Sequence, residues 1–385
     1  MTDFSRRDVA RSAMLGSASL LMGAASLPAQ AAASSSTLID PRSLGAKGDG
    51  KTDDTAALQR ALDAAGEASG SVFLSPGVYL SRQLHVRAAT ALVGIPAWNY
   101  HTGGSSVLRL AGADSKCLLD LSDARGATID GIALEGRDLG SGIHGMMTDR
   151  DKYVREDSFR IERCQINHFT GDGLHLDCIW CFSVRHCQIG FNQGDGINMR
   201  GWDGFILDNW FSGNRGAGFA ARHENASMTF TANRIEWNEG GNFLIHGGDG
   251  YQITGNFFDR AGLCGIALRK NEHGRGPTQV TITGNYIKRS GKSANPDTYD
   301  SSQIWIEGAT GVTCVGNNIW SGRDDGGEGV WSPSYGIVYQ DLENCVIRDN
   351  VLHDGALKQL MVDLGGHGEG VIVGDNPGRI FVAPK

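Results

Sequence analysis

Two short apolar alternations recur along residues 159–363, and this repeat constrains the fold more than any other feature of the sequence. The first alternation of each repeat ends in a fixed Asn or Cys, and successive fixed positions are 22 to 33 residues apart. Alternation with a period of two is typical of short strands with one buried face. A repeat in the low twenties suits one coil of a parallel β-helix, and it is too short for a βαβ unit or a propeller blade. The fixed positions are Cys164, Cys187, Asn209, Asn233, Asn256, Asn285, Asn317 and Asn350.

Stacked coils align equivalent positions, so we expect the fixed asparagines to be buried and to bond from coil to coil as a ladder. The cysteines do not read as a disulfide framework, because Cys164 and Cys187 occupy ladder positions. Cys178 and Cys181 form a lone C-x-x-C with no second pair at zinc-finger spacing. The sequence therefore predicts buried free thiols or an incidental pair, with redox or metal use as the alternative.

The N-terminus is typical of an export signal. Arg6 and Arg7 precede an Ala/Leu-rich run that ends in the A-x-A sequence of residues 29–31. Paired arginines before such a run resemble a twin-arginine signal peptide, and the A-x-A sequence resembles a cleavage site. We expect residues 1–31 to be removed, residues 32–39 to be a linker, and the mature protein to be periplasmic or secreted, with no membrane attachment.

A capping helix is predicted after the linker. Thr52 or Asp53 is expected to cap it, with acidic residues in its first turn. Its apolar stripe has helical spacing, and a helix that covers the first coil would protect the open end of a β-helix. We expect this cap over about residues 40–80 and regular coils over about 105–376, within one domain of residues 40–385. The stripe is formed by Leu58, Ala61, Leu62 and Ala65.

The segment LGAKGDGKTDDTAALQRAL (44–62), followed by SPGVYL (75–80), closely resembles the N-terminus of the pectate-lyase superfamily. The resemblance implies an all-β fold: a single-stranded right-handed parallel β-helix (solenoid) with an N-terminal capping α-helix. It also implies a polysaccharide or oligosaccharide partner and a monomer or homotrimer. It does not fix the reaction, because that superfamily holds lyases, hydrolases, fructan transferases, epimerases and phage tail fibres.

Charged and aromatic side chains follow one outward column of the second alternation. A solvated sheet face would supply Ser, Thr and Lys as readily, so we interpret this face as a groove centred on His246 to Glu307. Long insertions at residues 270–277, 294–300 and 323–335 flank the same strand, and Tyr299, Trp305 and Trp331 would suit stacking on sugar rings. The column reads Asp177, Arg200, Arg222, His246, Arg269, Glu307, Gln340 and Asp363, with His175 and Asn198 at neighbouring outward positions.

One hypothesis for this groove is β-elimination on an acidic polysaccharide. Arginines bind carboxylates bidentately, so Arg200 and Arg222 would hold uronates, as would Arg269. His246, between two arginines, is predicted to be neutral and able to take a proton. Lys270 and Tyr299 are further acid or base candidates. Glu307 would orient Arg269 or hold a cation such as Ca²⁺, and no other cofactor is predicted.

A glycoside hydrolase or glycosyl transferase, including a fructan transferase, is the alternative enzyme. Asp177 and Glu307 are five coils apart, about 24 Å, too far for a catalytic pair, which needs about 5–9.5 Å. Glu307 could instead pair with a loop acid such as Asp300. Asp172 and Asp195, in equivalent Gly-Asp-Gly turns, resemble the acidic motifs of polygalacturonase-type hydrolases, although the next coil lacks the histidine of that family.

Two further readings complete the set of hypotheses. Turn formation alone explains Asp172 and Asp195 as well. A non-catalytic glycan-binding β-helix is the third class of function. The net charge of −8 argues against a nucleic-acid partner.

Overall fold

The computed structural model describes residues 38–96 and 105–382, all of which lie in one compact unit that spans Ser36–Lys385. Within these residues no helix combines the length and the apolar character needed to cross a membrane. The expected signal peptide, residues 1–31, lies outside the described residues, as does most of the expected linker.

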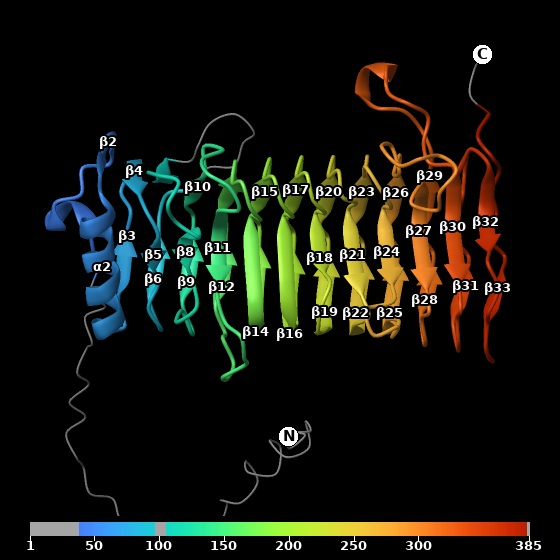
Figure 1. The fold of residues 1–385 in the computed structure, drawn as a ribbon, viewed down its shortest axis with the longest axis horizontal. Helices are drawn as coiled ribbons and strands as arrows, with labels where there is room; N and C mark the ends of the chain where they lie inside the picture. The colour runs from blue at the N-terminus through green and yellow to red at the C-terminus, as the bar shows by residue number, and fades with distance from the viewer. Residues whose placement is uncertain (1–37, 97–104, 383–385) are drawn as a thin grey trace, which may run out of the picture. The chain divides into compact units, whose positions relative to one another are not determined.

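Parallel strands stack side by side in successive coils, and each coil contributes to three faces (Figure 1). Two faces form one 22-stranded sheet, because β14 and β16 run through both of them, and the third face is an 11-stranded sheet. The predicted parallel β-helix is therefore confirmed.

The first face contains the beginnings of β14 (Leu174–Arg185) and β16 (Ile197–Leu207), together with β5 (Leu84–His85), β8 (Cys117–Asp120), β11 (His144–Thr148), β18 (Phe219–Ala221), β21 (Phe243–His246), β24 (Ile266–Arg269), β27 (Ser302–Glu307), β30 (Tyr335–Gln340) and β32 (Gln359–Asp363). The second face contains the ends of β14 and β16, together with β1 (Leu38–Ile39), β3 (Ser71–Phe73), β6 (Ala91–Val93), β9 (Thr128–Asp130), β12 (Arg160–Glu162), β19 (Asn225–Thr231), β22 (Asp249–Thr254), β25 (Thr278–Thr283), β28 (Thr313–Val315), β31 (Val346–Arg348) and β33 (Ile372–Gly374). The third face contains β2 (Asp49–Asp53), β4 (Gly77–Ser81), β7 (Ser106–Leu110), β10 (Ala133–Glu135), β13 (Gln165–Asn167), β15 (Gln188–Gly190), β17 (Trp210–Ser212), β20 (Arg234–Glu236), β23 (Phe257–Asp259), β26 (Tyr286–Lys288) and β29 (Asn318–Trp320).

The core is a stack of apolar side chains that alternate with outward polar ones along each strand. On the first face, for example, Phe243 pairs with Ile266, which pairs with Ile304 in the next coil. Because the side-chain period is two, this register buries every second residue and leaves the intervening positions facing solvent.

The asparagine ladder is confirmed at the turn between the second and third faces. Asn256 accepts hydrogen bonds from the backbone N–H and the side-chain amide of Asn233, and its own amide donates to Asn285 and to the Phe230 carbonyl. Asn256 and Asn285 are buried. Each ladder member thus satisfies both side-chain polar atoms, as a buried amide requires.

A second ladder, which the repeat analysis missed, occupies the turn between the third and first faces. Asn192, Asn214 and Asn238 bond in series from coil to coil, at side-chain distances of 2.9–3.0 Å. All three are buried. Their spacing of 22 and then 24 residues matches the length of one coil, and this could have revealed them in the sequence.

Helix α2 (Thr55–Ala68) covers the N-terminal coils and buries the predicted stripe. The expected cap residue is wrong by one or two positions, because Asp54 occupies the N-cap and the first turn of the helix contains no acidic residue. The Asp54 carboxylate accepts the N–H groups of Lys47 and Gly48 instead, which closes the glycine-rich loop. Parallel pairing already begins with β1, which occupies the last two residues of the expected linker, and with β2, within the segment expected as cap. Two short 3₁₀ helices complete the structure, Pro41–Leu44 and Asp325–Gly327.

One coil differs in register from the expectation. Asp363 pairs with Tyr339 rather than with Gln340, so it does not continue the outward column. Val362, in contrast, is buried. The cysteines are free thiols, as predicted: Cys178 and Cys181 are not joined, and the other six are buried.

Candidate functional site

Two of the predicted groove residues, His246 and Arg269, line a small cavity on the first face. His246 and Arg269 are register partners on β21 and β24. Together with Leu244 and Ala267 they line a cavity of about 150 Å³, which the turn residues Gly240, Gly241, Leu263 and Cys264 and the loop residue Asp300 also line. The insertion before β27 therefore contributes to the site, as its position in the sequence predicted.

The environment of His246 favours the neutral form of its imidazole, which can accept a proton. Burial of the imidazole, followed by the positive charges of Arg222 and Arg269, lowers the pKa of His246, while Glu307 opposes this shift. The neutral form that the sequence predicted is therefore the favoured one near neutral pH. A neutral imidazole can accept a proton from a substrate carbon or oxygen.

Carboxylates from neighbouring coils hold both flanking arginines. Arg222 forms a two-point contact with Asp195, with 3.1 Å between Nη2 and Oδ1. The Nε of Arg269 donates to Glu307 at 2.7 Å, and its Nη1 lies 3.7 Å from Asp300. These contacts fix the guanidinium groups in place, and the donors of Arg269 that Glu307 does not use remain for a ligand.

The remaining predicted cations are further from the cavity. Arg200 lies 3.2 Å from Asp177 and donates to the Cys178 thiol at 2.9 Å. Lys270 donates to Asp341 at 2.6 Å, and this hydrogen bond raises the pKa of Lys270. A lysine that is held charged in this way cannot serve as a base, so the structure argues against that role.

The predicted aromatic residues have intramolecular partners. The Arg269 guanidinium carbon lies 3.5 Å from the centre of the Trp305 ring, and Tyr299 meets the same ring edge-on at 5.9 Å. Trp331 packs against Phe381 at 4.6 Å and Arg323 at 5.1 Å. Arg269 thus occupies one face of Trp305, which limits the stacking surface that we expected there.

Asp172 and Asp195 serve the turns, as the simpler interpretation held. One oxygen of Asp172 accepts the Asp195 N–H at 2.7 Å, and one oxygen of Asp195 accepts the Ala217 N–H at 2.6 Å. The second oxygen of each points to a different partner, His175 for Asp172 and Arg222 for Asp195. Turn formation therefore uses one oxygen of each carboxylate, and outward side chains bind the other.

Two histidines flank Asp172, and sequence reasoning missed His144 entirely. His175 lies 2.7 Å from Asp172 Oδ2, and this hydrogen bond raises the pKa of His175. His144 accepts the Asp172 N–H at 2.8 Å, and burial lowers its pKa. His144 is the first residue of β11 on the adjacent coil, so only the register of the coils brings it to this cluster.

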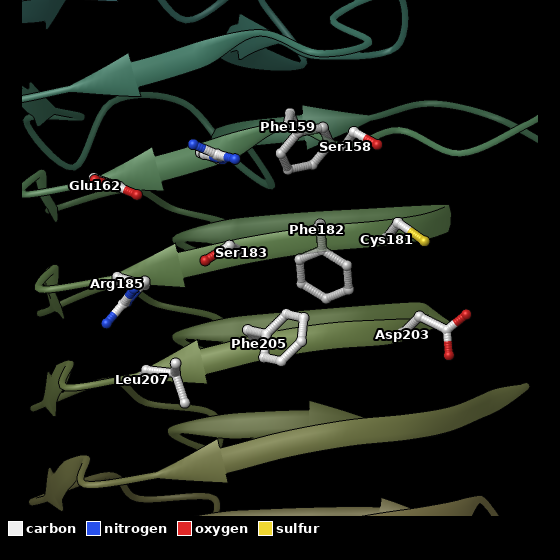
Figure 2. A pocket seen from close by; sticks show the side chains of 11 residues that line it. Ser158, Phe159, Glu162, Cys181, Phe182, Ser183, Arg185, Asp203, Phe205 and Leu207 are labelled. Carbon is white, nitrogen blue, oxygen red and sulfur yellow. The ribbon is translucent and has the colours of Figure 1, made fainter.

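A larger concavity, of about 710 Å³, lies on the second face (Figure 2). Phe159, Phe182 and Phe205 follow one another on consecutive strands there, and Phe205 is 52% exposed while the other two are buried. Its charged lining, Arg160, Glu162, Arg185 and Asp203, includes no histidine. The first face therefore remains the better candidate for proton-transfer chemistry, although its cavity is smaller.

Comparison with known proteins supports the fold. Residues 39–267, more than half of the chain, match the family model described as Rhamnogalacturonase A/epimerase, pectate lyase-like. Residues 223–381 match the model described as Right handed beta helix region, which agrees with the predicted handedness.

Solved structures at 13–18% identity share this fold. The A-module of the Azotobacter vinelandii mannuronan C-5 epimerase AlgE4 has a TM-score of 0.59 at 17% identity, covering 90% of this chain and 100% of that chain. DFA-IIIase from Arthrobacter chlorophenolicus A6 has a TM-score of 0.61 at 13% identity, covering 86% of each chain. The catalytic unit of a GH87 alpha-1,3-glucanase from Streptomyces thermodiastaticus has a TM-score of 0.53 at 18% identity, covering 91% of this chain and 71% of that chain.

Proposed function

We propose that this chain, which belongs to the Rhamnogalacturonase A/epimerase, pectate lyase-like family, is an exported enzyme that acts on an acidic polysaccharide by β-elimination in the first-face groove. The observation that carries the proposal is the position of His246. It lines a cavity with Arg269, and its pKa is lowered by burial and by the two arginines beside it.

The chemistry requires three tasks at one uronic-acid residue, and the groove offers a group for each. An arginine neutralises the carboxylate, which makes the proton at C5 more acidic. His246 takes that proton, the electron pair forms the C4–C5 double bond, and the C4–O bond breaks. The leaving oxygen then needs a proton, and we assign Tyr299 as its donor, because Tyr299 precedes Asp300 in the loop that lines the cavity.

Hydrolysis is the second candidate, and the spacing of Asp172 and Asp195 favours it. These aspartates lie on adjacent coils, about 4.8 Å apart along the axis, close to the separation of about 5–5.5 Å that retaining glycosidases use. Proteins of similar structure include a glucanase as well as a C-5 epimerase. The pKa of Asp172 is nevertheless lowered, by hydrogen bonding to His175 and the charge of His144, against burial. A general acid needs the opposite shift.

Product analysis on a panel of polyuronates and neutral glycans tests the proposal. Elimination creates an unsaturated uronate that absorbs in the ultraviolet, whereas hydrolysis releases reducing ends without that absorbance. We expect absorbance with a polyuronate, and we expect His246→Ala to lower kcat by about 10²–10⁴-fold, the range for loss of a general base.

Two variants separate the candidate mechanisms. In a lyase, Glu307→Gln should cause a partial loss, because Glu307 only positions Arg269. Tyr299→Phe should lower turnover and leave binding unchanged. Full activity in His246→Ala would contradict the proposal. Hydrolysis would be indicated if the protein released reducing ends without ultraviolet absorbance and if Asp195→Asn abolished this release. The carboxylates, and not His246, would then be the catalytic groups. Binding without turnover on any glycan would instead indicate a non-catalytic module.

A further inference from the structure

We propose that His144, Asp172 and His175 form a binding site for one divalent transition-metal ion in the first-face groove. A ring nitrogen of each histidine and a carboxylate oxygen of Asp172 all lie within 4.8 Å of one another. Neighbouring coils supply these residues: His144 begins β11, Asp172 lies in the turn before β14, and His175 is the second residue of β14.

The spacing of the donor atoms suits a single ion. The Asp172 Oδ2 lies 2.7 Å from Nδ1 of His175 and 3.5 Å from Nδ1 of His144. Metal–ligand bonds of about 2.0–2.2 Å place tetrahedral ligand atoms about 3.3–3.6 Å apart. Nδ1 of His144 accepts the Asp172 N–H at 2.8 Å, so metal binding requires the His144 ring to turn and present a nitrogen to the ion. Small rotations of Asp172 and His175 would then bring the three donors to this distance and leave a fourth position toward the groove.

The surrounding contacts hold the donors in place. The other Asp172 oxygen accepts the Asp195 N–H at 2.7 Å, so the carboxylate cannot turn away from the histidines. Asn198 donates to Oδ2 at 3.3 Å, from the next coil. The His144 ring lies 4.4 Å from the His175 ring. Such outer contacts orient metal ligands in known sites, and their loss typically costs about 10–100-fold in affinity.

The donor set determines the class of ion. Two imidazoles and one carboxylate suit Zn²⁺, Co²⁺, Ni²⁺ or Cu²⁺, whereas Ca²⁺ prefers six to eight oxygen ligands. The three side chains are largely buried, but each keeps some contact with solvent: 17% of His144, 10% of Asp172 and 27% of His175 is exposed. An ion could therefore reach the site from solvent.

An open coordination position would let the ion bind an anionic group of a ligand. Strand β14 is three coils from β21, about 14 Å along the axis. The ion would therefore bind a polysaccharide at a point about 14 Å from His246, on a different sugar residue. This role rests on the proposed function, but metal binding itself does not. The test below therefore uses the protein without any glycan.

Titration of the metal-free mature protein with Co²⁺ and with Zn²⁺ tests the site. We expect one equivalent to bind, and Co²⁺ to develop visible absorption typical of a low-coordinate nitrogen and oxygen site. His144→Ala and His175→Ala should each remove this binding. Asn198→Ala should weaken it about 10–100-fold, as for outer-contact losses elsewhere. Equimolar Ca²⁺ should not compete.

Two further variants exclude trivial explanations. Asp172→Asn keeps an oxygen acceptor for the Asp195 N–H, so it should fold normally while losing metal affinity. His168→Ala is the matched control, because His168 also lies near an aspartate, 3.4 Å from Asp138, but belongs to no cluster of three ligands. Absence of stoichiometric binding would overturn the proposal, as would binding that survives in folded His144→Ala and His175→Ala proteins.

Discussion

His246 shows how single residues in this fold acquire their chemistry from coils that are distant in sequence. The two arginines beside it come from the preceding and following coils, and their carboxylate partners come from one coil further in each direction. The imidazole therefore lies between two arginine–carboxylate ion pairs. Its proton affinity depends on residues that are as far apart in the sequence as positions 195 and 307. Changing one of these neighbours should change the pKa of His246 without touching the ring.

The pH dependence of turnover tests this arrangement. The lowered pKa keeps His246 neutral below the usual histidine value of about 6.5, so the acid limb of kcat/KM should lie below that pH. Arg269→Gln removes a positive neighbour and leaves Glu307 unpaired, so both effects should raise the pKa and move the limb to higher pH. Arg275→Gln, an equal charge change at an exposed loop residue, is the control. An acid limb that does not move in Arg269→Gln would exclude His246 as the titrating base.

The sequence predicted the column of side chains better than it predicted their partners. Outward positions follow from the alternation alone, so His246, Arg269 and Glu307 could be placed on one face. The contact of Lys270 with Asp341 joins residues 71 positions apart through a loop, and no local pattern encodes it. The same holds for His144, because the alternation around it did not belong to the detected repeat.

At the scale of the strand and turn, the two asparagine ladders connect the coils where backbone pairing is interrupted. Each ladder asparagine bonds to the backbone of one coil and to the side chain of the next. The ladders therefore fix the turn geometry that aligns the strands of all three faces. The register expected from the sequence was wrong at β32. Residues 360–362 are all apolar there, so the alternation does not indicate which side chains face the core.

Asn256→Leu should destabilise the protein without affecting the groove. The substitution leaves the Asn233 N–H, its side-chain amide and the Phe230 carbonyl without their buried partner. Buried unsatisfied groups cost about 1–3 kcal/mol each, so we expect at least that loss in the free energy of unfolding by denaturant titration. Gln252→Leu, on an exposed position of the same coil, should change it by less than about 0.5 kcal/mol. Equal stability of the two variants would show that the ladder contributes nothing.

At the scale of the molecule, the two ends of the described β-helix differ in how their apolar residues are covered. Helix α2 buries its apolar stripe over the first coils, whereas β33 at the other end carries Ile372 with 56% of its surface exposed. We propose that residues 1–31, which precede this domain, are a twin-arginine-type signal that directs export after folding. Free buried thiols are compatible with folding before export.

Replacement of Arg6 and Arg7 by Lys tests the export prediction. The receptor for such signals reads the guanidinium pair, and lysine keeps only its charge. We expect the precursor to accumulate in the cytoplasm, as shown by cell fractionation and by the size of the unprocessed chain. Arg11→Lys, which leaves the pair intact, should be exported normally. Mature protein outside the inner membrane in the double variant would refute the twin-arginine assignment.

The ladders also determine how such a chain can change length during evolution. Between residues 209 and 350 each coil presents the same Asn acceptor and donors to its neighbour at the turn between the second and third faces. Removal of one complete coil from this stretch therefore rejoins Asn to Asn and strand to strand. A deletion within a strand instead shifts the register of its face, whereas the loops differ in length between coils that are 22 to 33 residues long. The groove can therefore gain or lose ligand contacts in whole steps of about 4.8 Å, each step carrying one outward column position, while the core on either side keeps its packing.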